Sequence, residues 1–350
     1  MKRVKLFLAV LLTAALLCGC GGPQTAPVDP DPPAPVEPAE PELPAAIDFT
    51  WKPYVSNVYI TETAGASLEQ QLRAAVDAML NRAEYSPCPI DDMETDKLVG
   101  TLRQSFPPFA QILADYRIQD GQIFYTYALS AEEQTRLMDD FARQVEAIIE
   151  EAVCETDTAL MAVLSLYHHY SKAITYDYAG LDSDPGEVDL TAYRGIMEKE
   201  GICQTFAPAF AYLCMQLGVD AITVGGLNST NDEAHSWVML RLDGKDYFAD
   251  PTFENGDGGQ GLRYFGMTGE KRALDGYEQK DVNVGWNLKF AGDMSLDDTR
   301  FMPLWPVQTI VEITRTPEGD MVLDAISSDG DLLTVTITQA GAITVELTEE

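Results

Sequence analysis

The chain has 350 residues, of which 46% are hydrophobic and 23% charged. This is the composition of an ordinary globular protein and argues against wholesale disorder, a collagen or a polytopic membrane protein. With 56 acidic residues against 23 Lys and Arg, the net charge is -33, so phosphate backbones are repelled and nucleic acid is disfavoured as a partner. At roughly 150 residues per domain, the length predicts about two domains.

The N-terminal segment predicts export and a lipid anchor. Residues 1–19 hold a basic start and an apolar run that is too short to span a membrane and is typical of a signal peptide. The sequence Leu-Cys-Gly-Cys at 17–20 resembles a bacterial lipobox, in which Cys20 is the lipidated residue; the alternative is a plain secretory signal. Residues 20–47 are rich in Pro and acidic residues and should form an extended linker. We therefore expect an extracytoplasmic protein that touches the bacterial cell membrane only through its lipid anchor.

An N-terminal α+β region is expected over residues 48–128. Alternating large apolar residues over 48–62 indicate a strand. The apolar positions of 67–83 recur every four residues and indicate an amphipathic helix. Residues 117–128 are typical of a β-hairpin with Asp-Gly at its turn.

The main core is expected over residues 129–308. Its first helix should begin after Ser130, because Glu133 three residues later completes a capping-box pattern. A polar, broken stretch separates the first two helices from the third, which Gly218 should end. The expected elements are helices to about 153, at 157–174 and at 203–217, a loop at 175–200, a strand at 219–225 and a hairpin at 234–250.

The C-terminal segment, residues 309–350, is expected to be a small antiparallel β meander. Leu333, Val335 and Ile337 alternate with threonines, which is the period-two pattern of a half-buried strand. About forty residues are too few to be stable alone, so we expect the meander to pack on the core.

One cysteine and one histidine stand out as chemically active. Cys203 opens a predicted helix, where free backbone N–H groups and the positive end of the helix dipole favour a nucleophilic thiolate. Only three histidines exist to act as its base, and His168 and His169 are neighbours on a helix whose side chains diverge by about 100°, so we expect no metal site there. His235 begins a predicted strand and is the candidate base.

The hairpin register predicts the partner of that histidine. If the turn has two residues, Leu242 faces Lys245 and Asp250 faces Trp237. His235 and Trp237 then point to the same side, so Asp250 lies diagonal to His235 within side-chain reach. An aspartate there fixes the imidazole tautomer and leaves the other ring nitrogen to face the thiol.

Three sequence blocks resemble the transglutaminase-like superfamily of papain-like thiol enzymes. They are Gly-Ile-Cys-Gln-Thr-Phe-Ala at 201–207, Ala-His-Ser-Trp-Val at 234–238 and Asp-Gly-Lys-Asp-Tyr-Phe-Ala-Asp-Pro-Thr at 243–252. The resemblance implies an α+β fold in which a helix carrying the cysteine packs on an antiparallel sheet. It also implies that Cys203 is the nucleophile, His235 the base and Asp250 the orienting acid. We expect no cofactor, and the spacing of the Asp-rich loops is not that of a regular calcium loop. A departure from the family pattern is Thr205, which stands where glycine is frequent and could narrow the cleft.

The remaining site residues follow less directly. The Cys203 backbone N–H is the expected oxyanion donor, with Gln204 and Tyr193 as further candidates, and Trp237 either lines the cleft or packs under His235. The expected reaction is acyl transfer on a peptide or protein, including cell-wall peptide, with hydrolysis favoured over transamidation. The alternative is a surface module that binds without turnover. A cleft that keeps all three residues favours the enzyme.

Overall fold

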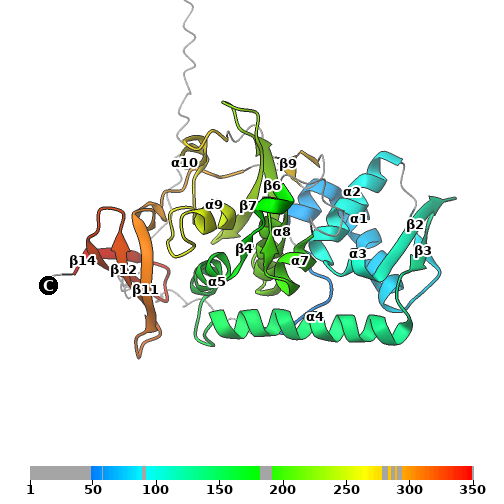
Figure 1. Ribbon diagram of the computed structural model, residues 1–350, viewed down its shortest axis with the longest axis horizontal. Coiled ribbons are helices and arrows are strands. Elements are labelled where there is room, and N and C mark those ends of the chain that lie inside the picture. Colours follow the sequence, from blue (N-terminus) through cyan, green and yellow to red (C-terminus); the bar gives the residue numbers. More distant parts are fainter. Residues whose placement is uncertain are drawn as a thin grey trace, which may run out of the picture. The chain divides into compact units, whose positions relative to one another are not determined.

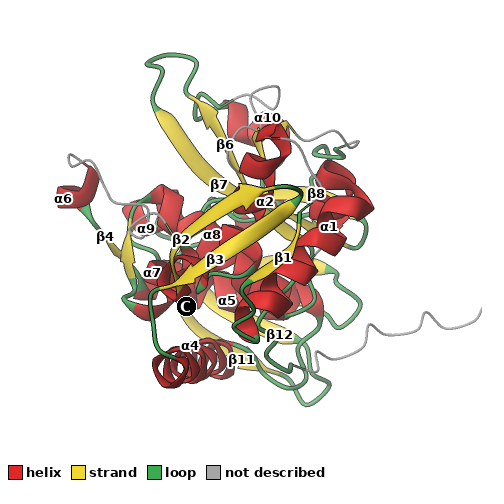
Figure 2. Ribbon diagram, turned by 90° about the vertical axis from the view of Figure 1, so that its right-hand side faces the viewer, coloured by secondary structure: helices red, strands yellow, loops and turns green. Residues whose placement is uncertain are grey.

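The computed structural model describes residues 49–56, 58–88, 92–181, 191–277, 283–284, 288–289 and 294–348. The expected signal peptide (1–19), the expected lipidation site Cys20 and the expected linker (20–47) lie outside the described residues. The described part combines helices with antiparallel sheets, so the α+β class is confirmed (Figure 1; Figure 2).

The helices and strands follow one another along the chain with short connections. The helices are α1 (Val58–Leu80), α2 (Asp92–Ser105), α3 (Phe109–Ile112), α4 (Ala131–Ala152), α5 (Ala159–Ala173), α6 (Tyr178–Leu181), α7 (Ala192–Met197), α8 (Cys203–Gln216), α9 (Pro251–Gly256), α10 (Gly269–Ala273) and the 3-10 helix η3 (Met302–Leu304). The strands are β1 (Tyr85–Pro87), β2 (Leu113–Gln119), β3 (Gln122–Tyr127), β4 (Thr175–Tyr176), β5 (Glu200–Gly201), β6 (Ala221–Leu227), β7 (Ala234–Leu242), β8 (Lys245–Ala249), β9 (Asn283–Val284), β10 (Leu288–Lys289), β11 (Val307–Arg315), β12 (Met321–Ser327), β13 (Leu332–Ile337) and β14 (Ile343–Leu347).

Helix α8 lies at the centre of the core. Every one of its side chains except that of Gln204 is buried, because the helix is apolar around its whole circumference and needs neighbours on all sides. It packs on β6 and β7 and touches α7 and α9 (Figure 1). Those strands belong to an antiparallel sheet of order β10-β9-β6-β7-β8. The expected packing of the cysteine helix on an antiparallel sheet is confirmed.

The strand expected over 48–62 is wrong. The described residues before α1 are irregular, and α1 begins at Val58 and continues through the helix expected at 67–83. The Val58 N–H donates to the Asp220 carboxylate at 2.9 Å, and the buried Tyr59 hydroxyl donates to Asp246 at 2.6 Å. The helix start is therefore fixed by two carboxylates more than 150 residues away in sequence, which local alternation cannot reveal.

Most other elements appear where they were expected. The hairpin of β2 and β3 is confirmed and adds β1 on its other edge, as Figure 2 shows. The capping box is confirmed as well, since the Ser130 side chain accepts from the Glu133 N–H and the Glu133 carboxylate accepts from the Ser130 N–H. The expected loop at 175–200 is wrong in part, because the described residues there form α6, α7 and a parallel pair of β4 and β5.

The C-terminal meander forms a four-stranded antiparallel sheet in the order β11-β12-β13-β14. It packs on the core as expected. The Arg315 guanidinium pairs with the buried Asp157 carboxylate through two contacts of 2.6 and 2.8 Å. Backbone bonds from Leu262 N–H to Val307 C=O and from Ile310 N–H to Gln260 C=O add a second attachment.

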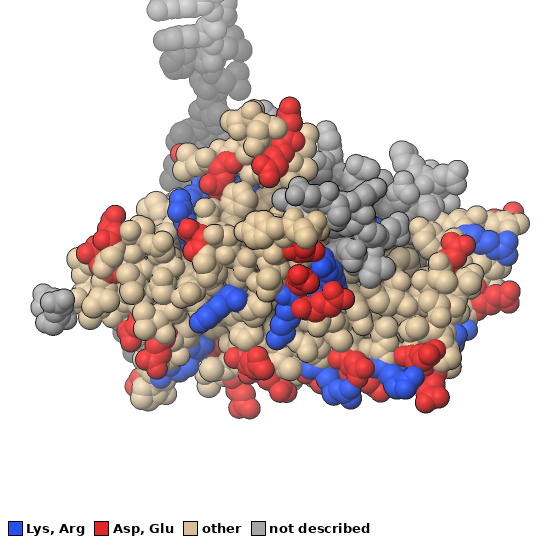
Figure 3. All heavy atoms as spheres, viewed as in Figure 1, with Lys and Arg blue, Asp and Glu red and all other residues tan. Residues whose placement is uncertain are grey.

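On one face of the described part, charged side chains of both signs are mixed (Figure 3). On the face seen in Figure 3, acidic and basic side chains are interspersed, most plainly along α4 at the lower edge. None of the helices in the described part of the chain has the length and apolar character that a membrane crossing needs.

Candidate active site

Cys203 is the first residue of α8, directly after the short strand β5. At this position its backbone N–H has no acceptor within the helix. Gly201 allows the tight approach before the helix, since an added Cβ would lie 2.4 Å from the Cβ of Thr205. Thr205 is fully buried beneath this turn, so it does not narrow the cleft as its replacement of glycine suggested. Cys203 as a whole residue is buried, with 8% of its surface exposed.

The hairpin register is confirmed. Leu242 pairs with Lys245, and the pairing continues to Val238 opposite Ala249. Asp243 and Gly244 both have positive φ, 52° and 74°, as a two-residue turn matched to the strand twist requires. The arithmetic of paired positions therefore holds up to the end of β8, where Asp250 follows.

His235 and Asp250 meet as the register predicts. The His235 Nε2 lies 2.7 Å from Asp250 Oδ2, and both side chains are buried. Asp250 takes Nε2, so Nδ1 is the ring nitrogen that remains for the Cys203 thiol, whose interaction with the imidazole contributes to the raised pKa of His235. The structure thus brings together Cys203, His235 and Asp250 from a helix start, a strand and a strand end.

Hydrogen bonds fix both the side chain and the backbone carbonyl of Asp250. Its Oδ1 accepts from the backbone N–H groups of Thr252 and Phe253 at 3.1 and 3.0 Å, so it caps the N-terminus of α9. Its own carbonyl accepts from the Tyr167 hydroxyl at 3.1 Å. Burial alone would raise the pKa of Asp250, but His235 and Arg272 outweigh it, so the pKa is lowered and the group is a carboxylate.

The surroundings of the His235 imidazole raise its pKa and favour its positively charged form. Burial by itself lowers the pKa of His235, but the Asp250 carboxylate and the Cys203 thiol more than offset it and raise the pKa to about 9. At neutral pH the ring then carries a proton on each nitrogen, and one of these N–H groups donates to Asp250. A protonated imidazole beside the Cys203 sulfur is the partner that a thiol nucleophile needs.

Sequence reasoning missed Arg272, which lies on α10. Its side chain is fully buried, and its Nη1 lies 3.0 Å from Asp250 Oδ2, the oxygen that also bonds His235. No short motif marks it, because a five-residue helix after a loop carries no pattern typical of a site. A buried arginine becomes visible only when the fold shows which carboxylate it faces.

The other candidate residues are placed differently. Gln204 is exposed in the first turn of α8, beside Cys203, and stays a candidate oxyanion donor. Tyr193 stacks on Phe141 of α4 at 5.5 Å between ring centroids, and it is not among the residues that line the cleft at His235. Trp237 is fully buried and stacks under His235 at 6.0 Å, so it supports the imidazole and does not line the cleft.

An open cavity of about 370 Å³ leads to His235. Its walls come from β4, α6, β7 and α9, and three tyrosines give it an aromatic surface. The lining residues are Tyr176, Tyr178, Glu233, His235, Thr252, Phe253, Gly256, Asp257 and Tyr264. A cavity of this size holds a few residues of an extended peptide.

Glu254 is a buried carboxyl directly behind Asp250. Its Oε2 accepts from the Tyr167 hydroxyl and the Tyr264 N–H, both at 3.0 Å, but burial dominates and raises the pKa of Glu254 to about 7. A carboxyl with a raised pKa stabilises the fold below its unfolded pKa of about 4.5, and this contribution is lost as the pH rises through 7.

We therefore expect Glu254→Gln to flatten the fall in stability between about pH 4.5 and 7. Between pH 5 and pH 8 the wild type should therefore lose about 2–3 kcal/mol more stability than the variant, because only the wild type ionises a buried carboxyl. Urea unfolding at pH 5 and pH 8 measures this. Glu132→Gln, at an exposed position of α4, is the matched control. Equal stability losses with pH in wild type and Glu254→Gln would contradict the assignment.

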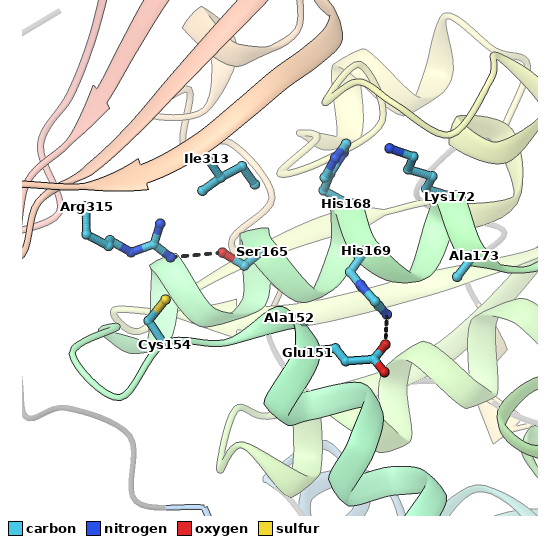
Figure 4. Close-up of a pocket in the computed structure, with 10 residues that line it drawn as sticks. All are labelled: Glu151, Ala152, Cys154, Ser165, His168, His169, Lys172, Ala173, Ile313 and Arg315. Carbon is cyan, nitrogen blue, oxygen red and sulfur yellow. Dashed lines mark hydrogen bonds and ion pairs between the residues drawn. The ribbon is translucent and has the colours of Figure 1, made fainter.

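A second hollow, of about 550 Å³, lies between α5 and β11 (Figure 4). His168 and His169 both line it but point apart, and His169 Nε2 lies 3.6 Å from Glu151 Oε2.

Within the described residues, no three His, Cys, Asp or Glu side chains gather closely enough to hold a metal ion. The four cysteines of the described part are all free, namely Cys88, Cys154, Cys203 and Cys214.

The site thus places a cysteine at a helix start near a histidine on β7 and an aspartate directly after β8, which is an arrangement that a thiol nucleophile could use. The family model of the Transglutaminase-like superfamily matches residues 146–251, which include Cys203, His235 and Asp250. The chain therefore contains a transglutaminase-like core. No curated protein matches the chain.

Three solved structures are similar to parts of the chain. One is a transglutaminase (TGase) at 14% identity and a TM-score of 0.28, with 42% of this chain and 47% of the other covered. The second is a protein from Cytophaga hutchinsonii assigned as a cysteine protease, at 13% identity and a TM-score of 0.31, with 63% of this chain and 64% of the other covered. The third is arylamine N-acetyltransferase C from Bacillus anthracis, at 12% identity and a TM-score of 0.26, with 61% of this chain and 92% of the other covered. The chain spans less than two thirds of the length of the first two, and at these scores the likeness adds nothing to the family match.

Proposed function

We propose that this protein is a thiol acyltransferase that hydrolyses peptide or amide bonds through Cys203, His235 and Asp250. The observation that carries the proposal is the 2.7 Å contact between His235 Nε2 and Asp250 Oδ2, which leaves the other ring nitrogen for the nearby Cys203 thiol. This is the order of contacts that nucleophilic catalysis by a thiolate requires.

The proposed reaction has two halves. The Cys203 thiolate attacks the carbonyl carbon of the substrate, and the carbonyl electrons move to the oxygen. The backbone N–H at the start of α8 donates a hydrogen bond to this oxyanion. The C–N bond then breaks, the His235 proton passes to the leaving amine, and a thioester remains. Water attacks the thioester while His235 takes up its proton, the C–S bond breaks, the carboxylic acid leaves, and the thiolate–imidazolium pair is restored.

The proposed substrate is a peptide or protein, with cell-wall peptide as the leading case. The cavity at His235 offers the faces of Tyr176, Tyr178 and Tyr264, which suit an extended chain better than a small charged metabolite. The cell-wall proposal depends on the further proposal that Cys20 is lipidated and that residues 20–47 act as a linker outside the cell. Changing Cys20 to Ala should then release the chain from membranes or leave it unprocessed.

Substrate profiling of the purified chain tests the function. Wild type and Cys203→Ala are incubated with a peptide library and with isolated cell-wall peptide, with and without a fluorescent primary amine. Cleavage by wild type alone supports hydrolysis, and amine incorporation would replace hydrolysis by transamidation. Cys214→Ala is the matched control, because Cys214 is fully buried on the same helix. A wild type that binds these peptides without any turnover would support a binding module and overturn the enzyme.

A further inference from the structure

Arg272 is an arginine buried behind the catalytic candidates. None of its side chain is exposed, and its two anionic neighbours are Asp250 Oδ2 at 3.0 Å and Asp275 Oδ2 at 3.6 Å from Nη1. These contacts are ion pairs without the alignment of hydrogen bonds, since its Nε, Nη1 and Nη2 have no hydrogen-bond partner among the described residues. The guanidinium therefore acts on Asp250 mainly through its charge.

Three aromatic rings hold the guanidinium in place. Its central carbon lies 4.5 Å from the Trp237 ring centroid, 4.8 Å from that of Phe253 and 4.6 Å from that of Tyr277. The faces of these rings attract a cation and so compensate part of its lost hydration. A planar, permanently charged side chain suits such a stack better than lysine does.

The same three rings also surround the imidazole. The His235 ring centroid lies 6.0 Å from that of Trp237, 4.5 Å from that of Phe253 and 5.4 Å from that of Tyr277. Arg272 and His235 thus share their aromatic neighbours and share one carboxylate oxygen. The placement of one cation is coupled to the placement of the other.

The charges of this buried array balance when all four groups are counted. In the ionised form that the proposed function requires, a thiolate at Cys203, an imidazolium at His235 and a carboxylate at Asp250 sum to one negative charge, which is costly in a site shielded from water. Arg272 supplies the missing positive charge. It also competes with His235 for the field of Asp250, because both approach Oδ2.

We propose that Arg272 is a positioning residue that neutralises the Cys203–His235–Asp250 array and limits how strongly Asp250 holds the proton on His235. The inference rests on the proposed function, because the array matters to turnover only if Cys203 is the nucleophile. As a consequence, Asp250 stabilises the protonated imidazole less, and the imidazolium releases its proton more readily to the leaving amine.

Other charged and titratable groups face the array from the elements packed around it, and they are unchanged in the variants that follow. They are Tyr167 of α5, Tyr176 of β4, Glu233 beside β7, Glu254 of α9, Asp275 after α10 and Tyr277.

The test is an NMR titration of the histidine rings in the purified chain. Only three histidines contribute signals, and His235→Ala assigns the one that matters. We expect Arg272→Met to move the titration of His235 upward by roughly one to two pH units, because Asp250 is then uncompensated. Arg272→Lys restores the charge and should return the titration towards the wild-type position.

Two further variants serve as a control and as a replacement in this titration. Arg300→Met is the matched control, since Arg300 also pairs with an aspartate and stacks on aromatic rings but lies against Tyr247 and Phe301, and it should leave His235 unmoved. Arg272→Gln removes the charge in the same way if Arg272→Met does not fold. An unmoved His235 in a folded Arg272→Met or Arg272→Gln chain would show that Arg272 only fills space. Because the titration needs no substrate, a shifted His235 in a chain without turnover would overturn the proposed function and keep the electrostatic role of Arg272.

Discussion

Asp250→Asn is expected to lower turnover by about four orders of magnitude, the size of loss that follows when an orienting aspartate of such a triad becomes an amide. The amide can still accept one hydrogen bond, but it no longer carries the charge that keeps His235 protonated. The thiolate–imidazolium pair is then no longer preformed.

The same substitution should also destabilise the fold, by about 3–5 kcal/mol, because it leaves the buried Arg272 with only Asp275 at 3.6 Å. Asp250→Asn with Arg272→Met removes both charges and should recover part of this loss without recovering turnover. Urea unfolding and kcat/KM on the profiled substrate measure the two effects. Turnover within tenfold of wild type in a folded Asp250→Asn chain would contradict the role of Asp250.

Trp237→Ala should destabilise the protein by about 3–5 kcal/mol, which is typical for removing a buried aromatic side chain. Trp237 is fully buried, stacks under His235, and carries Arg272 on its face at 4.5 Å. Its loss opens a cavity beneath the imidazole and removes one of the three rings that hold the guanidinium. Reactivity at Cys203 should fall as well, since the imidazole loses its support.

Trp237→Phe is the matched control for this cavity. The indole Nε1 has no hydrogen-bond partner among the described residues, so phenylalanine sacrifices no hydrogen bond. It should cost about 1 kcal/mol and keep most of the Cys203 reactivity. Thermal unfolding of both variants distinguishes packing from polarity. A Trp237→Ala chain as stable as Trp237→Phe would show that the ring is not part of the site's support.

The candidate site was predictable wherever local geometry determines it. The Asp243-Gly244 turn sets the hairpin register, and the register alone brings Asp250 to His235. The start of α8 at Cys203 follows equally from sequence, because the helical pattern begins there. The family match over residues 146–251 agrees with the same blocks of sequence.

The rest depends on contacts between distant segments. The start of α1 is set by Asp220 and Asp246, so alternation over 48–62 indicated a strand that does not form. Arg272 was not predictable, because its meaning comes from Asp250 and from three rings on other elements. Trp237 could be placed under His235 or in the cleft from sequence, and burial decides for the former.

The rate of iodoacetamide alkylation at each cysteine against pH, resolved by peptide mass spectrometry, tests the central claim most directly. Exposed Cys154 is an internal reference, and burial raises the pKa of Cys214, which should stay unreactive. We predict that Cys203 reacts at pH values well below about 8.5, where free cysteine titrates. We also predict that His235→Ala abolishes this reactivity while Cys214→Ala leaves it unchanged. A Cys203 profile that follows Cys154 and does not move in His235→Ala would contradict a preformed thiolate–imidazolium pair.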